Sequence, residues 1–137
     1  MKFVVVPQGF VAQAFSMSSE MLEPLIQSGA SGGDYTVDGV LESLNSGLFK
    51  LAILTDGESI FIAAVFEMRW HRDGETAFVH LLAGRKNTVS QDTWLMFRSL
   101  MEKCGAQRIE MASSGPQARL WRRLGFKPKY QVFEVLL

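Results

Sequence analysis

The feature that most constrains the fold is a run of three strand-like segments joined by two Asp-Gly turns. Residues 48–55, 59–69 and 76–83 are rich in β-branched and aromatic side chains, and the joints between them contain Asp56-Gly57 and Asp73-Gly74. Asp-Gly provides a residue that adopts positive φ easily, as a tight hairpin requires. The sequence therefore predicts a three-stranded antiparallel meander in the middle of the chain.

The segments before the meander predict one strand and two helices. A first strand over residues 3–6 ends at Pro7, and apolar positions at helical spacing predict a helix over residues 10–26. After a flexible loop over residues 28–34, Thr36 is expected to cap a short helix that Gly47 ends.

The segments after the meander alternate between helix and strand. We predict a helix over 91–103, a strand over 108–112, a helix that begins near Pro116 and ends at Gly125, and a final strand over 129–137. The predicted order is β-α-α-β-β-β-α-β-α-β, in a single α/β domain over residues 1–137.

Composition and size are those of a globular protein. The 137 residues suffice for one domain, and 47% apolar with 20% charged residues is too hydrophobic for disorder. No apolar run is long enough to span a bilayer, and the apolar N-terminal run is too short for a signal peptide. Cys104 is the single cysteine, so no internal disulfide can form and no cysteine-based metal site is indicated. We expect a cytoplasmic protein with no membrane partner.

The charge is zero overall but unevenly distributed. Residues 1–60 carry two cations and seven acids, a balance of 2 − 7 = −5, whereas residues 101–137 carry seven cations and three acids, a balance of 7 − 3 = +4. The basic C-terminal third could attract an anionic ligand, or it could be a solvated helix face. Overall neutrality argues against a nucleic-acid partner.

Residues 118–126, Ala-Arg-Leu-Trp-Arg-Arg-Leu-Gly-Phe, together with the order of elements, resemble the GCN5-related N-acetyltransferase (GNAT) family. Members commonly carry a helix reading N-x-x-A-x-x-L-Y-x-K-x-G-F before a last strand. Here Leu120 and the run Arg123-Leu124-Gly125-Phe126 match, and Trp121 stands where the family usually has Tyr. The resemblance implies a mixed, mostly antiparallel central sheet flanked by helices. It further implies acyl transfer from acetyl-CoA to an amine, either a small molecule or a protein.

The family's pyrophosphate loop, Q/R-x-x-G-x-G/A, aligns with residues 85–90. Small residues there let the backbone approach phosphate, and amides at a helix start hold the anion. Arg85 and Ser90 fit the pattern, whereas Thr88 replaces the first glycine and Val89 adds a second β-branched residue, which resists positive φ. The candidate cofactor-binding residues implied by the resemblance are Leu82, Ala83, Arg85, Lys86, Thr88, Val89, Ser90, Trp121 and Arg122.

Amine acylation needs a base for the amine and an acid for the leaving thiolate. His80 has the side chain best matched to neutral pH, although a lone His in an apolar strand can equally be structural. Glu75 beside a turn and Glu67 in the preceding strand are the other catalytic candidates, and each could instead be a solvated charge. The indole of Trp121 is a very poor acid.

Two functions therefore stay open. The first is an active N-acyltransferase, which predicts that the central strands splay apart after His80. The second is a catalytically inactive domain of the same fold, used for binding or assembly, and some small tailed-phage proteins resemble that combination. The altered loop and Trp121 favour the second, and the topology favours the first. An exposed C-terminal edge strand could also pair two copies into a homodimer.

Overall fold

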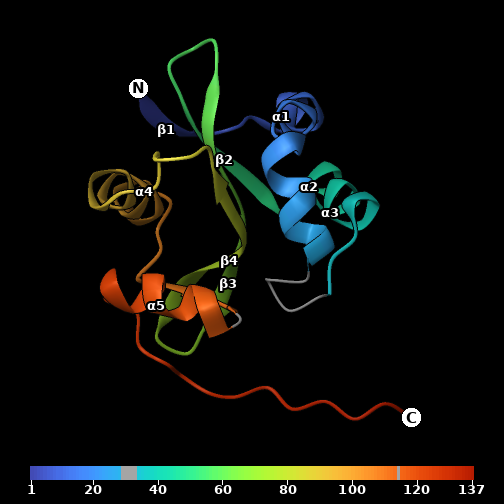
Figure 1. Ribbon diagram of the computed structural model, residues 1–137, viewed down its shortest axis with the longest axis vertical. Helices are drawn as coiled ribbons and strands as arrows, with labels where there is room; N and C mark the ends of the chain where they lie inside the picture. Colours follow the sequence, from blue (N-terminus) through green and yellow to red (C-terminus); the bar gives the residue numbers. More distant parts are fainter. Residues whose placement is uncertain (29–33, 114) are drawn as a thin grey trace.

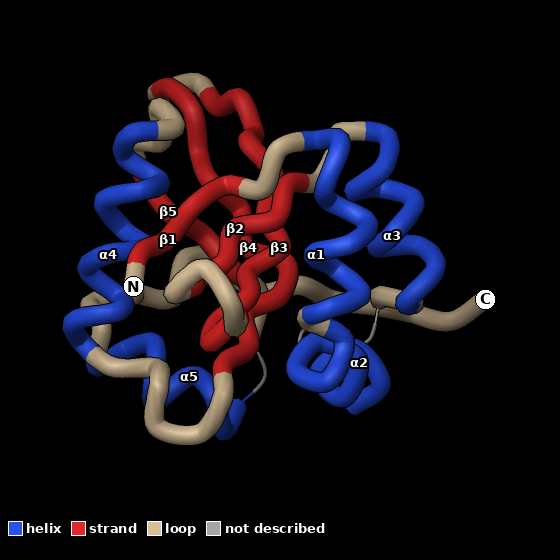
Figure 2. Tube along the Cα trace, turned by 90° about the horizontal axis from the view of Figure 1, so that it is seen from above, coloured by secondary structure: helices blue, strands red, loops and turns tan. Residues whose placement is uncertain are grey.

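The computed structural model describes residues 1–28, 34–113 and 115–137. A single sheet lies between two layers of helices (Figures 1 and 2). Its five strands lie in the order β1-β2-β3-β4-β5, with bounds β1 Lys2–Val5, β2 Lys50–Thr55, β3 Ile60–His71, β4 Gly74–Gly84 and β5 Arg108–Met111. Each neighbouring pair is antiparallel except β4 and β5, which are parallel. The predicted mixed α/β class with a mostly antiparallel sheet is confirmed.

The helices divide between the two faces of the sheet. On one face lie α1 Val11–Met17, α2 Ser19–Ser28 and α3 Val37–Ser46, and on the other lie α4 Gln91–Lys103 and α5 Gly115–Arg123 (Figure 2). A short 3₁₀ turn, η1 Gln8–Phe10, precedes α1. None of the helices in the described ranges is long and apolar enough to cross a bilayer.

The predicted meander is confirmed as strands β2, β3 and β4. Gly57 and Gly74 adopt positive φ, 100° and 120°, at the two turns. In the first turn the Asp56 carboxylate accepts hydrogen bonds from the amides of Glu58 (2.9 Å) and Ser59 (2.8 Å), and these bonds lower the pKa of Asp56. The Asp-Gly pairs that indicated the hairpins therefore also form their turns.

Two elements differ from the predicted order. The helix expected over residues 10–26 is divided at Ser18, where φ is −94° and ψ is 0°. The buried Ser18 hydroxyl donates to the Ala14 carbonyl (2.8 Å), and this bond satisfies the hydroxyl where α1 ends. The break turns α2 away from α1, a change that the continuous apolar spacing does not reveal.

The second difference is the C-terminus: the strand predicted over residues 129–137 is wrong. No regular structure follows α5, and the segment runs away from the body (Figure 1). Its alternation of β-branched and aromatic residues is typical of a strand, but a strand exists only where a neighbouring backbone completes its hydrogen bonds.

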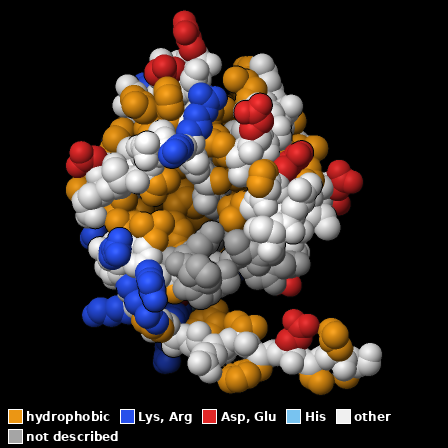
Figure 3. Space-filling model, viewed as in Figure 1, with side chains coloured by type: hydrophobic (Ala, Val, Ile, Leu, Met, Phe, Trp, Pro, Cys, Tyr) orange, Lys and Arg blue, Asp and Glu red, His pale blue; other side chains and the backbone are white. Residues whose placement is uncertain are grey.

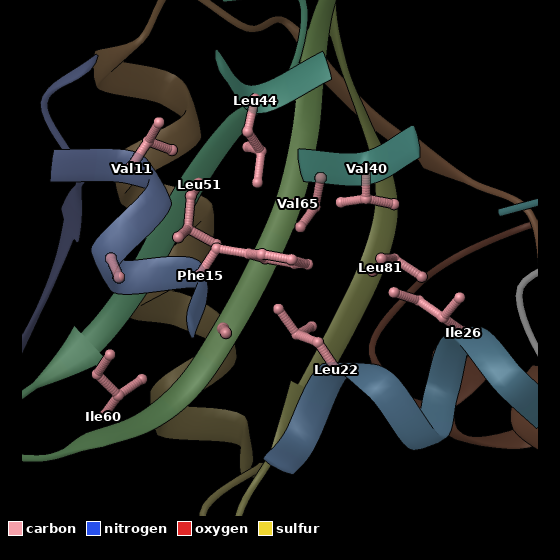
Figure 4. Packing of buried hydrophobic residues seen from close by; sticks show 12 residues of the cluster. Val11, Phe15, Leu22, Ile26, Val40, Leu44, Leu51, Ile60, Val65 and Leu81 are labelled. Atoms are coloured by element: carbon pink, nitrogen blue, oxygen red, sulfur yellow. The ribbon is translucent and has the colours of Figure 1, made fainter. Parts of the chain in front are cut away.

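Each helical layer encloses its own apolar cluster against the sheet. The α1–α3 side packs Phe15, Leu22 and Val40 onto Val65 and Leu81 (Figure 4). The α4 side packs Phe97 and Met101 onto the opposite face, with Phe3 edge-on to Phe97 at 5.5 Å. The central strands β3 and β4 are thus covered on both faces, which fixes their register.

Candidate functional site

The centre of the sheet is irregular at one residue, His80. In the pairing of β3 with β4, Val65 lies opposite Leu81 and Phe66 lies opposite Val79, so His80 is an extra residue that forms a β-bulge. Bulges redirect a side chain and are frequent beside active sites. The bulge carries the only histidine of β4 out of the regular alternation.

The parallel strands also separate at this point. Pairing of β4 with β5 ends at Val79 opposite Met111, one residue before His80. Beyond it, residues 80–84 of β4 have no strand partner on the β5 side within the described part of the chain. The pairing thus ends where the splay was predicted, and the backbone groups of residues 80–84 on that side have no strand partner among the described residues.

Both ring nitrogens of His80 have side-chain partners. Nε2 lies 2.9 Å from Glu67 Oε1, and Nδ1 lies 2.6 Å from the Tyr35 hydroxyl. An ionised carboxylate only accepts, so Nε2 carries the proton and donates to Glu67. Nδ1 then accepts the proton of the Tyr35 hydroxyl. The result is a chain of hydrogen bonds, Tyr35 to His80 to Glu67, with a neutral imidazole in the middle.

Aromatic rings surround this imidazole. Phe49 stacks on His80 with ring centres 4.1 Å apart, and Phe78 and Tyr35 meet it edge-on at 5.0 and 5.4 Å. His80 is only 7% exposed. Burial lowers the pKa of His80, although its hydrogen bond and charge interaction with Glu67 oppose that change. Burial likewise raises the pKa of Tyr35. Both shifts favour the neutral forms of the two groups.

Glu67 is held from the other side by Arg69. Arg69 Nε donates to Glu67 Oε1 (3.0 Å), and the guanidinium carbon lies 3.8 Å from the ring centre of Phe78. Residues 67 and 69 share one face of β3 because side chains alternate along a strand. The carboxylate is therefore fixed between an arginine and a histidine.

Of the three catalytic candidates, the structure brings together His80 and Glu67 and separates Glu75. Glu75 lies opposite Trp70 at the other end of β4, five residues from the bulge, or about 17 Å at the usual strand rise. Its carboxylate lies close to Gly105, at the end of α4. Glu75 thus lies outside the hydrogen-bonded group around His80.

The loop over residues 85–90 closes upon itself. Asn87, with φ of 65°, is the residue in the positive-φ region, so Thr88 does not have to adopt it. The Thr88 hydroxyl instead donates inward toward the carbonyls of Arg85 (2.5 Å) and Phe61 (3.2 Å). The expected conflict between β-branching at Thr88 and the loop backbone is thereby removed, because the unusual conformation falls one residue earlier.

Several loop amides are already used by the protein. The Thr88 amide donates to the Arg85 carbonyl (3.1 Å), and the Ser90 amide donates to the Thr93 hydroxyl (2.9 Å) in a capping box that opens α4. The amides of Lys86, Asn87 and Val89 have no acceptor in the described part of the chain. The loop thus retains exposed amides and two cationic side chains, Arg85 and Lys86, for an anion.

Besides the loop amides, the indole N–H of Trp121 is a further hydrogen-bond donor in this region. Its side chain is 8% exposed and contacts Phe126 edge-on at 5.8 Å, and its Nε1 has no hydrogen-bond partner among the described residues. Trp121 shares a small cavity with Leu82 of β4 and with Val89 of the loop. A buried N–H without a partner is rare, and it makes Trp121 a residue whose indole could still accept a partner if the packing around it opens.

The remaining cofactor candidates are spread around this region. Ala83 follows Leu82 along β4 and packs against the α1–α3 cluster, and Ser90 caps α4. Arg122 lies exposed in the last turn of α5, where Lys and Arg side chains gather on the surface (Figure 3). The structure therefore brings Leu82, Val89 and Trp121 together and leaves Arg122 on the outside.

Sequence reasoning missed Tyr35, Phe49, Phe78 and Arg69. Tyr35 directly precedes the Thr36 cap of α3, and Phe49 directly precedes β2, so both look like ordinary residues flanking an element. Only the approach of α3 and β2 to the bulge brings them onto His80. Glu67 and Arg69 carried a usable signal, because opposite charges two residues apart on a strand share a face.

Comparison with known proteins concerns the fold. No protein-family model and no curated protein sequence matches the chain. Solved structures do match it: an aminoglycoside acetyltransferase from an uncultured soil metagenomic sample, in complex with sisomicin, has a TM-score of 0.66 at 10% identity, covering 99% of this chain and 94% of that one. A predicted acetyltransferase from Clostridium acetobutylicum with acetyl-CoA has a TM-score of 0.65 at 13% identity, covering 98% and 95%. A Trypanosoma brucei acetyltransferase has a TM-score of 0.59 at 11% identity and covers 99% of both chains.

The chain therefore has the fold of the GNAT acetyltransferases, over essentially its whole length. Because the identities are 10 to 13%, the likeness defines the fold, and a function has to be argued from the site.

Proposed function

We propose that this protein transfers an acyl group, most simply acetyl, from an acyl-CoA to an amine. The observation that carries the proposal is the chain of hydrogen bonds from Tyr35 through His80 to Glu67, placed at the bulge where β4 and β5 separate. A proton relay and an open strand edge thus coincide at the centre of the sheet. Acyl transfer to an amine needs such a relay.

The residues around the splay fit a coenzyme A donor. The three loop amides without an acceptor and the side chains of Arg85 and Lys86 would hold its phosphates. The open edge of β4 would bind amide groups of its pantetheine arm. When bound, this donor supplies a thioester carbonyl that is open to attack by an amine.

His80 is too buried, and too fully hydrogen-bonded, to contact the amine itself. Tyr35 is less buried, so its hydroxyl is the group that exchanges protons with the reactants. As the Tyr35 oxygen takes the proton of the attacking amine, His80 Nδ1 takes the proton of Tyr35. The charge of Glu67 stabilises the imidazolium that forms, as in a catalytic triad.

The same hydrogen bonds then carry a proton in the opposite direction. Nδ1 returns its proton to Tyr35, and the Tyr35 hydroxyl delivers a proton to the sulfur as the carbon–sulfur bond breaks. The amine loses one proton and the sulfur gains one, so no other acid is required. This role for Tyr35 replaces the family tyrosine whose place Trp121 occupies.

A second function has its own support. The amides of Thr88 and Ser90 are taken up inside the loop, and Trp121 cannot act as an acid. Both features favour a domain that keeps the acyltransferase fold for binding or assembly and does not bind the cofactor.

The two functions differ in ligand binding and in turnover. We would measure thermal unfolding with and without acetyl-CoA, since a ligand at a hundredfold excess over its Kd stabilises the native state by about 2.7 kcal/mol. We expect acetyl-CoA to raise the unfolding temperature, and we expect the double variant Arg85→Ala, Lys86→Ala to show a smaller rise.

Thiol release with a panel of primary amines then reports catalysis. Tyr35→Phe should lower kcat by about 10²-fold or more, while Tyr130→Phe leaves kcat unchanged. Absence of any shift at millimolar acetyl-CoA would refute the enzyme and favour the binding domain.

A further inference from the structure

Three nitrogen atoms converge on a single oxygen of Glu67. Oε1 lies 2.9 Å from His80 Nε2, 3.0 Å from Arg69 Nε and 2.9 Å from Arg69 Nη2, whereas Oε2 accepts from no described residue. An arginine frequently spreads its two parallel N–H groups over both oxygens of a carboxylate. Here both groups point to the oxygen that His80 also uses. Arg69 and His80 therefore share the same negative charge.

The aromatic ring of Phe78 keeps Arg69 in this position. The guanidinium carbon lies 3.8 Å from the ring centre, and Phe78 lies directly opposite Glu67 in the pairing of β3 with β4. A guanidinium stacks favourably on an aromatic face while its edge stays in water. The side chain of Arg69 is 39% exposed. The carboxylate thus has a partly solvated cation on one side and a buried imidazole on the other.

Glu67 and Arg69 act in opposite directions on the two titratable groups of the relay. Burial is the largest influence, and it lowers the pKa of His80 and raises the pKa of Tyr35. Beyond burial, Glu67 raises both pKa values and Arg69 lowers both. Asp34, which precedes Tyr35, also raises the pKa of Tyr35. The two phenylalanine rings that contact the imidazole carry no charge. Arg69 is therefore the cation that offsets the carboxylate at both groups.

The relay needs an imidazole that is neutral before the reaction. A neutral His80 offers Nδ1 as the acceptor of the Tyr35 proton, whereas an imidazolium carries a proton on both nitrogens and accepts none. A carboxylate beside a histidine favours the imidazolium. Without a second cation on Glu67, the resting site would move toward the state in which Tyr35 cannot pass on its proton.

We propose that Arg69 is a positioning residue of the relay, which shares the charge of Glu67 so that His80 stays neutral at rest and ready for the Tyr35 proton. This role rests on the proposed acyl transfer, because such a balance matters only where the relay moves protons. The protonation of His80 can nevertheless be measured in the full chain without any substrate.

The first test is the pKa of His80, followed by NMR of the imidazole signals. The sequence holds two histidines, and His80→Phe assigns their signals. Arg69→Met keeps an apolar stem on Phe78 and removes the charge, so the His80 pKa should rise. Arg69→Lys keeps the charge, so it should leave the His80 pKa closer to the wild-type value. Urea unfolding checks that both variants are folded.

Arg108→Met is the matched control. Arg108 lies opposite Thr76, which lies opposite Arg69, so the two arginines share one face of the sheet. Its side chain is 35% exposed, and its Nη2 pairs with Asp73 (3.1 Å). Removing this cation should leave the His80 pKa at the wild-type value. An unchanged pKa in Arg69→Met would show that no charge is shared, and a fall would show that Arg69 only holds Glu67 against the ring. Either result overturns the proposal.

The pH dependence of turnover separates this inference from the proposed function. Because the relay needs neutral His80, kcat/KM should fall as the pH drops below the His80 pKa, and Arg69→Met should move that fall to higher pH. An active Arg69→Met variant with the wild-type pH profile would refute the role of Arg69 in the relay. A raised His80 pKa in Arg69→Met, with no turnover even in the wild type, would support the charge sharing and refute the acyl transfer.

Discussion

Replacing Tyr35 with Phe removes a single hydroxyl and leaves the Nδ1 atom of His80 without its donor. Nδ1 belongs to a ring that is 7% exposed, and the Phe49 ring stacks over it. A buried acceptor that loses its partner costs about 1–3 kcal/mol. Because Tyr35 is only half-buried and water can partly replace it, we expect a loss of about 1–2 kcal/mol in the free energy of unfolding.

The assay is urea unfolding at pH 7.5. With an m-value of about 2 kcal/mol/M, typical of a small domain, the midpoint should fall by about 0.5–1 M with m unchanged. Tyr130→Phe is the matched control, because Tyr130 is 68% exposed in the segment after α5 and should change the midpoint little.

A double-mutant cycle assigns the loss to this hydrogen bond. His80→Phe keeps a flat ring against Phe49 and removes both nitrogens, so in that background the Tyr35 hydroxyl has lost its acceptor. Tyr35→Phe should then cost nothing or slightly stabilise the protein, which corresponds to a coupling energy of about 1 kcal/mol or more. An equal loss in both backgrounds would refute the hydrogen bond and, with it, the proton relay.

Two further predictions concern buried polar groups. Thr76 is fully buried, and its hydroxyl has no partner in the part of the chain that the structure describes. Thr76→Val keeps the shape, so it should raise the free energy of unfolding by about 1 kcal/mol in urea melts. A loss of that size would mean that the hydroxyl is bonded. Burial lowers the pKa of His80 from its ordinary value of 6.5, so the unfolded chain binds its proton more readily. The stability due to neutral His80 is complete above that value and is lost as the pH falls below it. Unfolding free energies measured from pH 7.5 to 5 should therefore fall more steeply in the wild type than in His80→Phe, and parallel curves would contradict the assignment.

The sequence by itself determined the elements whose signals are local. The Asp-Gly joints fixed both hairpins, since their glycines adopt the positive φ that the turns require. Thr36 and Gly47 marked the ends of α3, and the expected cap bond from the Gly39 amide to the Thr36 hydroxyl is present (3.0 Å). The GNAT fold could also be predicted, because the order of elements restricts the topology to few choices.

Tertiary structure alone decided the site and the end of the chain. Tyr35 and Phe49 contact His80 only because α3 and β2 pack beside the bulge, and the position of that bulge depends on the pairing of β3 with β4. The strand pattern of residues 129–137 could not reveal whether a neighbouring backbone is present. Contacts between residues far apart in sequence follow from packing, whereas turns and caps follow from the backbone preferences of a few adjacent residues.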